Sequence, residues 1–198
     1  MYLDNGNTYL MSAKKRGMNM SSNYMISCNQ KELEVKSPWC VGKLRSNFLG
    51  TEFHCYGPGK NPGDTKNTDQ WRKEYATVQY EKNVFGMKGP RKMTVYIPGL
   101  NNNGDLIVVK PSKGDDSVYT RWKTDPQSIP RLINKPPKWS EEYQAFVLNF
   151  YGRVRLASVK NFQLIDEARE NYIFLQFGKV NEHEFTMDFQ WPVTPAQA

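Results

Sequence analysis

The sequence predicts a mainly β protein, and three observations support this fold class. Aromatic residues make up 13% of the 198 residues, with 11 Tyr and 10 Phe, and these side chains favour pleated surfaces over helices. Fourteen Gly and 12 Pro are spread along the chain, as in a protein of many short strands joined by turns. In segments such as Tyr75–Tyr80 the residue types alternate, which places Ala76, Val78 and Tyr80 on one face of a strand. Because no βα alternation is present, we expect a barrel or a sandwich.

Alternation and flanking turn residues predict the strands in chain order. They are Thr8–Ala13, Asn23–Cys28, Val41–Asn47, Glu52–Tyr56, Tyr75–Glu81, Lys92–Ile97, Asp105–Val109, Ala145–Phe150, Ser158–Leu164, Ile173–Phe177 and Glu184–Phe189. Clusters of Gly, Pro and Asn indicate loops at 57–63, 101–104 and 135–138. Residues 111–140 are predicted to form a long surface connection. The sequence indicates helical starts only at Trp71–Tyr75 and Ser140–Gln144. We find no repeat and no boundary, so one domain over 1–198 is expected.

Positive charge is concentrated in the first half of the chain. Residues 1–100 hold 15 Lys and Arg against eight Asp and Glu, whereas residues 101–198 hold 12 of each. The first half therefore carries the whole net charge of +7. This asymmetry indicates a localised basic patch, although a solvated basic face kept for solubility has the same composition. Nucleic acid, an anionic membrane or an acidic protein would suit such a patch.

The cysteines and the chain ends bear on the cellular compartment. Cys28, Cys40 and Cys55 lack paired spacing, which argues against a disulfide framework and a zinc site. The N-terminus does not have the pattern of a signal peptide, and no apolar stretch approaches the roughly 20 residues that span a bilayer. We expect a cytoplasmic or nuclear protein that is not secreted. Any contact with a membrane should be peripheral.

No residue pattern points to catalysis. His54 is next to Cys55, but neighbouring strand residues point to opposite faces, so they cannot form a catalytic dyad. His183 lies between two glutamates in a predicted turn. The sequence contains no Gly-x-Ser-x-Gly elbow, His-Glu-x-x-His motif or Walker loop. We expect no enzymatic activity, no metal and no cofactor.

Basic residues on predicted strands form the strongest candidate site. Lys43 and Arg45 are two residues apart, so they project from one face while Leu44 points toward the core. Such a pair suits a phosphate ester, because Arg grips it bidentately and Lys acts as a point charge. Arg72 precedes the next long strand, and Asn23 opens a strand beside the cations. Auxiliary basic contacts are expected from Lys14, Lys15, Arg16, Lys88, Arg91 and Lys92.

A second pair of cations has the same spacing. Arg153 and Arg155 lie in the electrically neutral half of the chain. There we expect them to be surface residues paired with nearby acids, so we rank them below the first pair.

Several motifs resemble the C-terminal domain of the tubby family in order and spacing. They are Ser22-Asn-Tyr24, Gly42-Lys-Leu-Arg-Ser-Asn47, Gly86-Met-Lys-Gly-Pro-Arg-Lys-Met93, Asn134-Lys-Pro-Pro137, Val147-Leu-Asn-Phe150, Gly152-Arg-Val154, Ser158-Val-Lys-Asn-Phe-Gln163, Gln176-Phe-Gly-Lys179 and Phe185-Thr-Met-Asp188. The resemblance runs from residue 8 to the last residue.

The resemblance implies a closed antiparallel β-barrel of about twelve strands around a central apolar helix. It also implies that the outside of the barrel binds phosphatidylinositol 4,5-bisphosphate. Lys43 and Arg45 match the family residues that hold the headgroup, and Arg72 and Asn23 match those that assist. Family members are described as membrane-tethered factors that can be released to the nucleus, and as adaptors that carry membrane receptors into cilia. The expected location is therefore the cytoplasmic side of the plasma or ciliary membrane, or the nucleus.

Two departures from the family pattern concern the chain ends. The segment N-terminal to the domain, on which the adaptor role depends, is not in this sequence, so receptor cargo cannot be inferred. The chain stops at Pro195-Ala-Gln-Ala198, where the family continues into the central helix. At about 25 cal/mol per Å² of apolar surface, losing that helix would cost on the order of 10 kcal/mol. We therefore expect a domain that is incomplete at its C-terminus and folds poorly by itself.

The leading hypothesis is phosphoinositide recognition at the cytoplasmic leaflet, where each cation contributes roughly 1 kcal/mol. The alternative is a nucleic-acid-binding transcription regulator that uses the same basic face. Against it, the sequence offers no recognition helix and no base-stacking motif on the basic strand. A protein-interaction scaffold is a third hypothesis. The preferred phosphoinositide isomer and the oligomeric state are not determined by the sequence.

Overall fold

The computed structural model describes residues 1–4, 6, 8–17, 20–34, 36–81, 92–112 and 116–198. Its strands are β1 (Ser12–Lys15), β2 (Asn23–Ser27), β3 (Cys40–Ser46), β4 (Glu52–Tyr56), β5 (Glu74–Tyr80), β6 (Met93–Tyr96), β7 (Arg131–Asn134), β8 (Lys138–Ser140), β9 (Ala145–Val147), β10 (Phe162–Asp166), β11 (Ile173–Lys179) and β12 (Phe185–Phe189). Its helices are α1 (Val118–Thr124) and the 3-10 turns η1 (Pro62–Asp64), η2 (Thr68–Gln70) and η4 (Glu167–Arg169).

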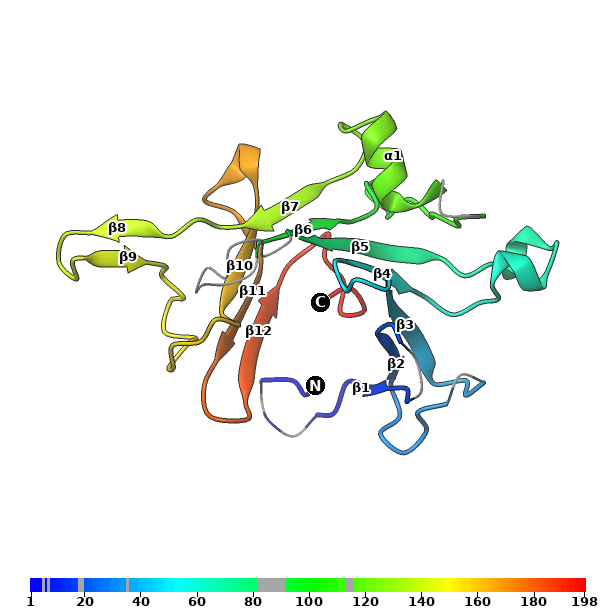
Figure 1. The fold of residues 1–198 in the computed structure, drawn as a ribbon, viewed down its shortest axis with the longest axis horizontal. Helices are drawn as coiled ribbons and strands as arrows, with labels where there is room; N and C mark the ends of the chain where they lie inside the picture. The colour runs from blue at the N-terminus through cyan, green and yellow to red at the C-terminus, as the bar shows by residue number, and fades with distance from the viewer. Residues whose placement is uncertain (5, 7, 18–19, 35, 82–91, 113–115) are drawn as a thin grey trace. The chain divides into compact units, whose positions relative to one another are not determined.

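The mainly β fold class is confirmed (Figure 1). Ten of the described strands form one antiparallel sheet in the order β1-β2-β3-β4-β5-β6-β7-β10-β11-β12, and β8 pairs with β9 in a separate hairpin. No hydrogen-bonded pairing of described residues joins β1 to β12, so the closed barrel is not confirmed. Residues 1–79, 96–130 and 197 form a first compact unit, and residues 80–95, 131–196 and 198 form a second.

In the first unit, β1 to β4 form antiparallel hairpins that continue into β5 (Figure 1). A β-bulge between Cys55 and Tyr56 shifts the register, so that Tyr56 lies opposite Glu74 rather than Tyr75. A bulge of this kind re-aims a side chain and is common beside functional sites. Here it turns Glu74 toward the same face as Tyr56.

Helix α1 lies within the segment that the sequence predicts as a surface connection, and that prediction is wrong. Ser117 caps the helix by accepting the backbone N–H of Thr120 at 3.2 Å. Val118 is fully buried in a cluster with Tyr96, Val109 and Ile129, and Trp122 packs against it. The seven residues are rich in β-branched and aromatic side chains, which have modest helix propensity. Tertiary packing therefore stabilises a helix that local sequence does not predict.

The second unit is built on β10, which pairs with both β7 and β11, and on β12, which pairs with β11. Most of its buried side chains are apolar residues of these strands and of β6, and Gln163 of β10 is a buried polar exception. The apolar ones include Met93, Val95, Leu132, Leu164, Ile165, Phe174 and Leu175. Alternation along β11 places Phe174 in this core, whereas Gln176, on the same face, pairs with Asp188 across the ladder.

The predicted strands agree with the structure in most places. The prediction for Glu52–Tyr56 has the observed bounds, and the first predicted strand is displaced to Ser12–Lys15. The strand predicted over Asp105–Val109 is wrong, because only isolated bridges form at Leu106 and Val109. Pro111, two residues after this segment, cannot donate to a ladder. Strands β7 and β8 were not predicted, and neither Trp71–Tyr75 nor Ser140–Gln144 is helical.

Candidate functional site

The register of β2, β3 and β4 places the predicted residues side by side on one face of the first unit. Asn23 is the cross-strand partner of Arg45, and Arg45 in turn is opposite His54. Two residues along β3, Lys43 is opposite Tyr56. Because cross-strand partners share a face, these side chains form one surface, which we call the cation face. Leu44 lies on the other face, as predicted, but is only half-buried.

Four positive side chains lie close enough on the cation face to influence one another. Burial lowers the pKa of Lys43 below its ordinary value, and repulsion from Arg45, Arg72 and Arg16 lowers it further. Cys40 opposes this effect only in part. Burial likewise lowers the pKa of Arg45, as do the charges of Arg72 and Arg16. A ligand with several negative charges would relieve this repulsion.

The loop between β4 and β5 fixes the position of Arg72. The backbone N–H of Arg72 donates to the carbonyl of Lys60 at 3.0 Å, and its guanidinium stacks 3.9 Å from the ring centroid of Tyr56. Gly59 has a φ of +129°, and a Cβ there would lie 2.7 Å from the Arg72 backbone. Glycine is therefore required for the close approach that places Arg72 beside Tyr56.

The cation face also contains buried polar atoms that have no hydrogen-bond partner among the described residues. They are Oδ1 of Asn23, Nε of Arg45 and Nε of Arg72. Asn23 is only 2% exposed, so its amide oxygen has lost water without gaining a protein donor. Over the same described ranges, no acidic side chain forms an ion pair with Lys43, Arg45 or Arg72. The charge of these three cations is therefore not neutralised by a described acid, which suits an anionic ligand.

His54 connects the cation face to two carboxylates. Its Nδ1 lies 2.6 Å from Oε1 of Glu74, and its Nε2 lies 2.9 Å from Oε1 of Glu52. Glu74 is buried and also accepts the backbone N–H of Val118 at 2.8 Å and the hydroxyl of Thr77 at 3.0 Å. Both ring nitrogens therefore face acceptors, which favours the imidazolium form.

The net effect on the pKa of His54 is upward. Burial lowers this pKa, but the hydrogen bonds and charges of Glu74 and Glu52 raise it and prevail. Cys55 is on the opposite face, opposite Leu44 and Ala76, as the alternation predicts. Burial, with a smaller effect of Glu74, raises the pKa of the Cys55 thiol to about 12. The two neighbours do not form a dyad.

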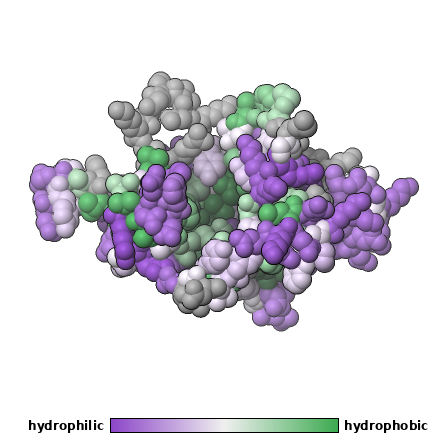
Figure 2. Space-filling model, turned by 90° about the horizontal axis from the view of Figure 1, so that it is seen from below, coloured by the Kyte–Doolittle hydropathy of each residue, from purple (hydrophilic) through white to green (hydrophobic). Residues whose placement is uncertain are grey.

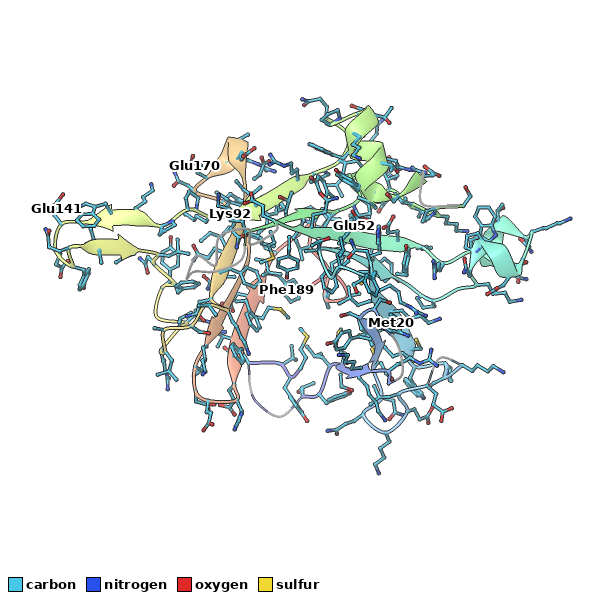
Figure 3. The ribbon with its side chains drawn as sticks, in the orientation of Figure 1. Met20, Glu52, Lys92, Glu141, Glu170 and Phe189 are labelled. Carbon is cyan, nitrogen blue, oxygen red and sulfur yellow. The ribbon has the colours of Figure 1, made fainter. Side chains whose placement is uncertain are left out.

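A cleft of about 690 Å³ adjoins the cation face. Its walls include Glu52, His54, Tyr56 and Arg72 together with Lys123 of α1. Glu52, at the start of β4, is labelled in Figure 3. Clefts of this size commonly hold small ligands. Polar and charged side chains dominate this one, so its chemistry suits a hydrophilic ligand.

The predicted auxiliary residues are distributed over several places. Arg16 is exposed and acts electrostatically on Lys43 and Arg45, and Lys14 is opposite Met25 on the cation face. Lys15 is opposite Tyr24, on the other face. In the second unit, exposed Lys92 lies 3.7 Å from Glu81. Lys88 and Arg91 lie outside the described residues.

Arg153 is paired with an acid, as the sequence predicts. Its Nε and Nη2 donate to the two carboxylate oxygens of Asp188 at 3.0 and 2.9 Å. Arg155 is exposed, and His183 lies in an exposed turn 3.8 Å from Glu182. The described side chains contain no group of three or more His, Cys, Asp or Glu that could hold a metal ion. In the same part of the chain, no helix is long and apolar enough to cross a membrane.

Sequence reasoning missed two features of this region. The first is the link between His54 and Glu74, which are 20 residues apart and meet only because of the β4–β5 register. The pair Glu52 and His54, two apart on a predicted strand, was a partial signal. The second is the exposure of Phe48 and Leu49, for which their place between the predicted strands Val41–Asn47 and Glu52–Tyr56 was a partial signal.

Comparison with known proteins gives a consistent result. The model of the Tub family matches residues 1–198. Tubby protein homolog 1 of Caenorhabditis elegans is 42% identical over 96% of this chain, and Tubby-related protein 1 of Mus musculus is 41% identical over 96%. Tubby-related protein 2 of Homo sapiens is 41% identical over the whole chain. The aligned parts cover 46%, 36% and 39% of these relatives, so the chain spans less than half of their length. The resemblance inferred from the motifs is confirmed.

Proposed function

The chain belongs to the Tub family, and we propose that it is a phosphoinositide-binding module that recognises the headgroup of phosphatidylinositol 4,5-bisphosphate. One observation carries the proposal. Lys43, Arg45 and Arg72 lie together without an acidic partner among the described residues, and the same face contains the unsatisfied amide oxygen of Asn23. The proposed role is binding rather than catalysis.

The chemistry of the site supports a phosphorylated polyol as ligand. Arg45 and Arg72 can donate bidentate hydrogen bonds to phosphate oxygens, and Lys43 adds a point charge. The amide of Asn23 lies beside Arg45, where its Nδ2 can donate a hydrogen bond to a phosphate oxygen. The adjoining cleft has room for an inositol ring beside Arg72, and Glu52 on its wall is a further acceptor for ring hydroxyls. A ligand with vicinal phosphates and free hydroxyls matches both kinds of group.

In this proposal the module tethers its protein to the cytoplasmic leaflet as a peripheral protein. Ciliary trafficking of membrane receptors and membrane-released transcription regulation are the roles proposed for the whole protein. Membrane receptors are then its cargo, and the plasma membrane, the cilium and the nucleus are its proposed locations. The family membership also supports closure of the sheet into a barrel, which we include in the proposal.

Flotation with vesicles tests the proposal directly. The 198-residue chain is mixed with vesicles that contain phosphatidylinositol 4,5-bisphosphate, or phosphatidylserine at matched charge, at physiological salt. We expect selective flotation with the bisphosphate lipid. Removing two cations with Lys43→Ala and Arg45→Ala should weaken this binding about 30-fold and remove the preference.

The matched control is Lys138→Ala with Arg155→Ala, which removes the same charge from exposed positions of the second unit. This control should retain the preference. Equal reductions in the two double variants would indicate a general effect of net charge and contradict the site. A competition arm tests the alternative function: soluble inositol trisphosphate should displace the vesicles, whereas displacement by short duplex DNA alone would favour nucleic-acid binding by the same face.

A further inference from the structure

The turn between β3 and β4 presents two large apolar side chains to solvent. Phe48 is 70% exposed and Leu49 is 66% exposed. Single exposed apolar residues are ordinary, but adjacent ones at the tip of a hairpin are unusual, because tight turns favour Gly, Asn, Asp, Ser and Pro. Their exposure is not required by the turn, which is made by the flanking residues.

The flanking residues hold this turn in a defined conformation. Oδ1 of Asn47 accepts the backbone N–H groups of Thr51 and Glu52 at 3.0 and 3.2 Å. The carbonyl of Asn47 accepts the N–H of Gly50 at 3.2 Å, and Gly50 has a φ of +64°. Phe48 and Leu49 are thus displayed on a hydrogen-bonded turn. An apolar contact made by this tip would cost little conformational entropy.

A third exposed apolar residue lies at the neighbouring hairpin end. Met20, labelled in Figure 3, is 85% exposed and precedes β2. Ser22 and Ser46 join the two hairpin ends: the N–H of Ser46 donates to the carbonyl of Ser22 at 2.9 Å, and the N–H of Ser22 donates to Oγ of Ser46 at 2.8 Å. Met20 and Phe48 are each two residues from this connection. We call Met20, Phe48 and Leu49 the apolar tip.

The charge around the apolar tip matches an anionic surface. Of the seven Lys and Arg in residues 5–52, five lie on β1, on β3 or directly after β1: Lys14, Lys15, Arg16, Lys43 and Arg45. The other two, Lys31 and Lys36, lie with Glu32 and Glu34 in the connection from β2 to β3, at the opposite end of these strands. The acid at the same end as the tip is Glu52, which pairs with His54. Arg45 is three residues before Phe48, and Arg16 follows β1 at the same end as Met20. Apolar side chains bordered by cations are the pattern of interfacial membrane anchors.

The spacing between the cations and the tip also fits a membrane. Three residues of extended chain span about 10 Å, so the cation face is set back from the tip by up to this distance. An inositol headgroup projects from the bilayer surface into water, so the groups that bind it must lie behind the groups that touch the lipid. Hydrophilic and hydrophobic side chains share the surface in Figure 2, so apolarity alone does not single out the tip.

We propose that the apolar tip inserts into the interfacial region of an anionic phospholipid bilayer while the cation face holds the headgroup. This inference rests on the proposed function, because a headgroup bound at the cation face would turn the apolar tip toward the bilayer. It adds a second, non-electrostatic contact: Phe48 and Leu49 partition between the lipid headgroups, with Met20 beside them. Binding to vesicles should therefore exceed what the headgroup alone provides.

The experiment removes the apolar tip and leaves the headgroup site intact. The variant Phe48→Ser with Leu49→Ser is compared with the native chain for vesicle flotation and, by calorimetry, for binding of soluble inositol 1,4,5-trisphosphate. We expect about tenfold weaker vesicle binding and unchanged binding of the soluble headgroup. Retained headgroup binding also shows that the variant folds.

Two controls separate insertion from general apolarity. The exchange Phe48→Leu with Leu49→Phe keeps the apolar surface and should keep vesicle binding. The pair Tyr143→Ser and Val159→Ser removes two side chains of the second unit, each 66% exposed, and should have no effect. Equal flotation of the serine tip variant and the native chain would overturn the insertion and leave a protein contact or solvent as the environment of the tip.

The outcomes for the two proposals differ. If the native chain shows no preference between the two anionic lipids but the serine tip variant floats less with both, the proposed function fails and the insertion holds. If the preference is present and the serine tip variant floats normally, the function holds and the insertion fails. A native chain that floats with neither lipid would contradict both.

Discussion

Two pairs of cations with the same spacing behave differently in the two units. In the first unit, Lys43 and Arg45 on β3 have no acidic partner among the described residues, and other cations surround them. In the second, Arg153 makes a bidentate pair with Asp188, and Arg155 is exposed. In the same unit, Arg131 pairs with Glu167, and Arg169 pairs with Asp166.

The two-residue spacing of a cation pair therefore does not by itself separate a binding site from a structural ion pair. A pair such as Arg153–Asp188 satisfies its own charge and needs no ligand. The cation face keeps its charge unsatisfied, at a cost in repulsion that a polyanion can remove. His54 is an exception on that face, because Glu52 and Glu74 neutralise it.

The largest effect is expected from giving the cation face an acid of its own. In Asn23→Asp, the new carboxylate lies opposite Arg45 in a buried position and should pair with it. Binding of soluble inositol trisphosphate should fall about 10- to 100-fold, because the carboxylate both neutralises Arg45 and repels phosphate. Calorimetry measures the loss, and Asn23→Ala, which adds no charge, should lose less. A variant with native affinity would show that Arg45 does not contact the ligand.

A smaller effect should distinguish the two units by stability. Arg153→Ala leaves Asp188 without its bidentate partner, and because both side chains are partly exposed we expect a loss of about 1 kcal/mol in the free energy of unfolding. Arg45→Ala removes a repelled cation and should leave the free energy of unfolding unchanged or slightly raised. Urea denaturation of both variants measures this difference. An equal loss in the two variants would mean that Arg45 is also a structural residue.

The smallest effect concerns the exception, His54. Its pKa is raised in the folded state, so its contribution to stability is fully present below its unfolded pKa of about 6.5 and is lost as the pH rises through the folded value. The native chain should therefore exceed His54→Gln in stability at acidic pH, and the difference should shrink at alkaline pH. Denaturation at several pH values measures it. A difference that grows with pH would mean that the imidazole is neutral when folded.

Much of the candidate site could be predicted from the sequence. The spacing of Lys43 and Arg45 on an alternating strand indicates a shared face, and the structure places them there. Arg72 and Asn23 were selected through family motifs, and they lie in the same cluster. Glu74 and Lys123 could not be predicted, because they reach this region through a bulge and through a helix stabilised by tertiary packing.

The sequence by itself determined the mainly β class, the basic first half of the chain and the family. These depend on composition, two-residue periodicity and ordered motifs, which are local properties of the chain. Only the tertiary structure decided which cations are neutralised, how His54 is charged and where the apolar tip lies relative to the cations. Each of these depends on cross-strand register and burial, which join residues distant in sequence and therefore leave no local pattern.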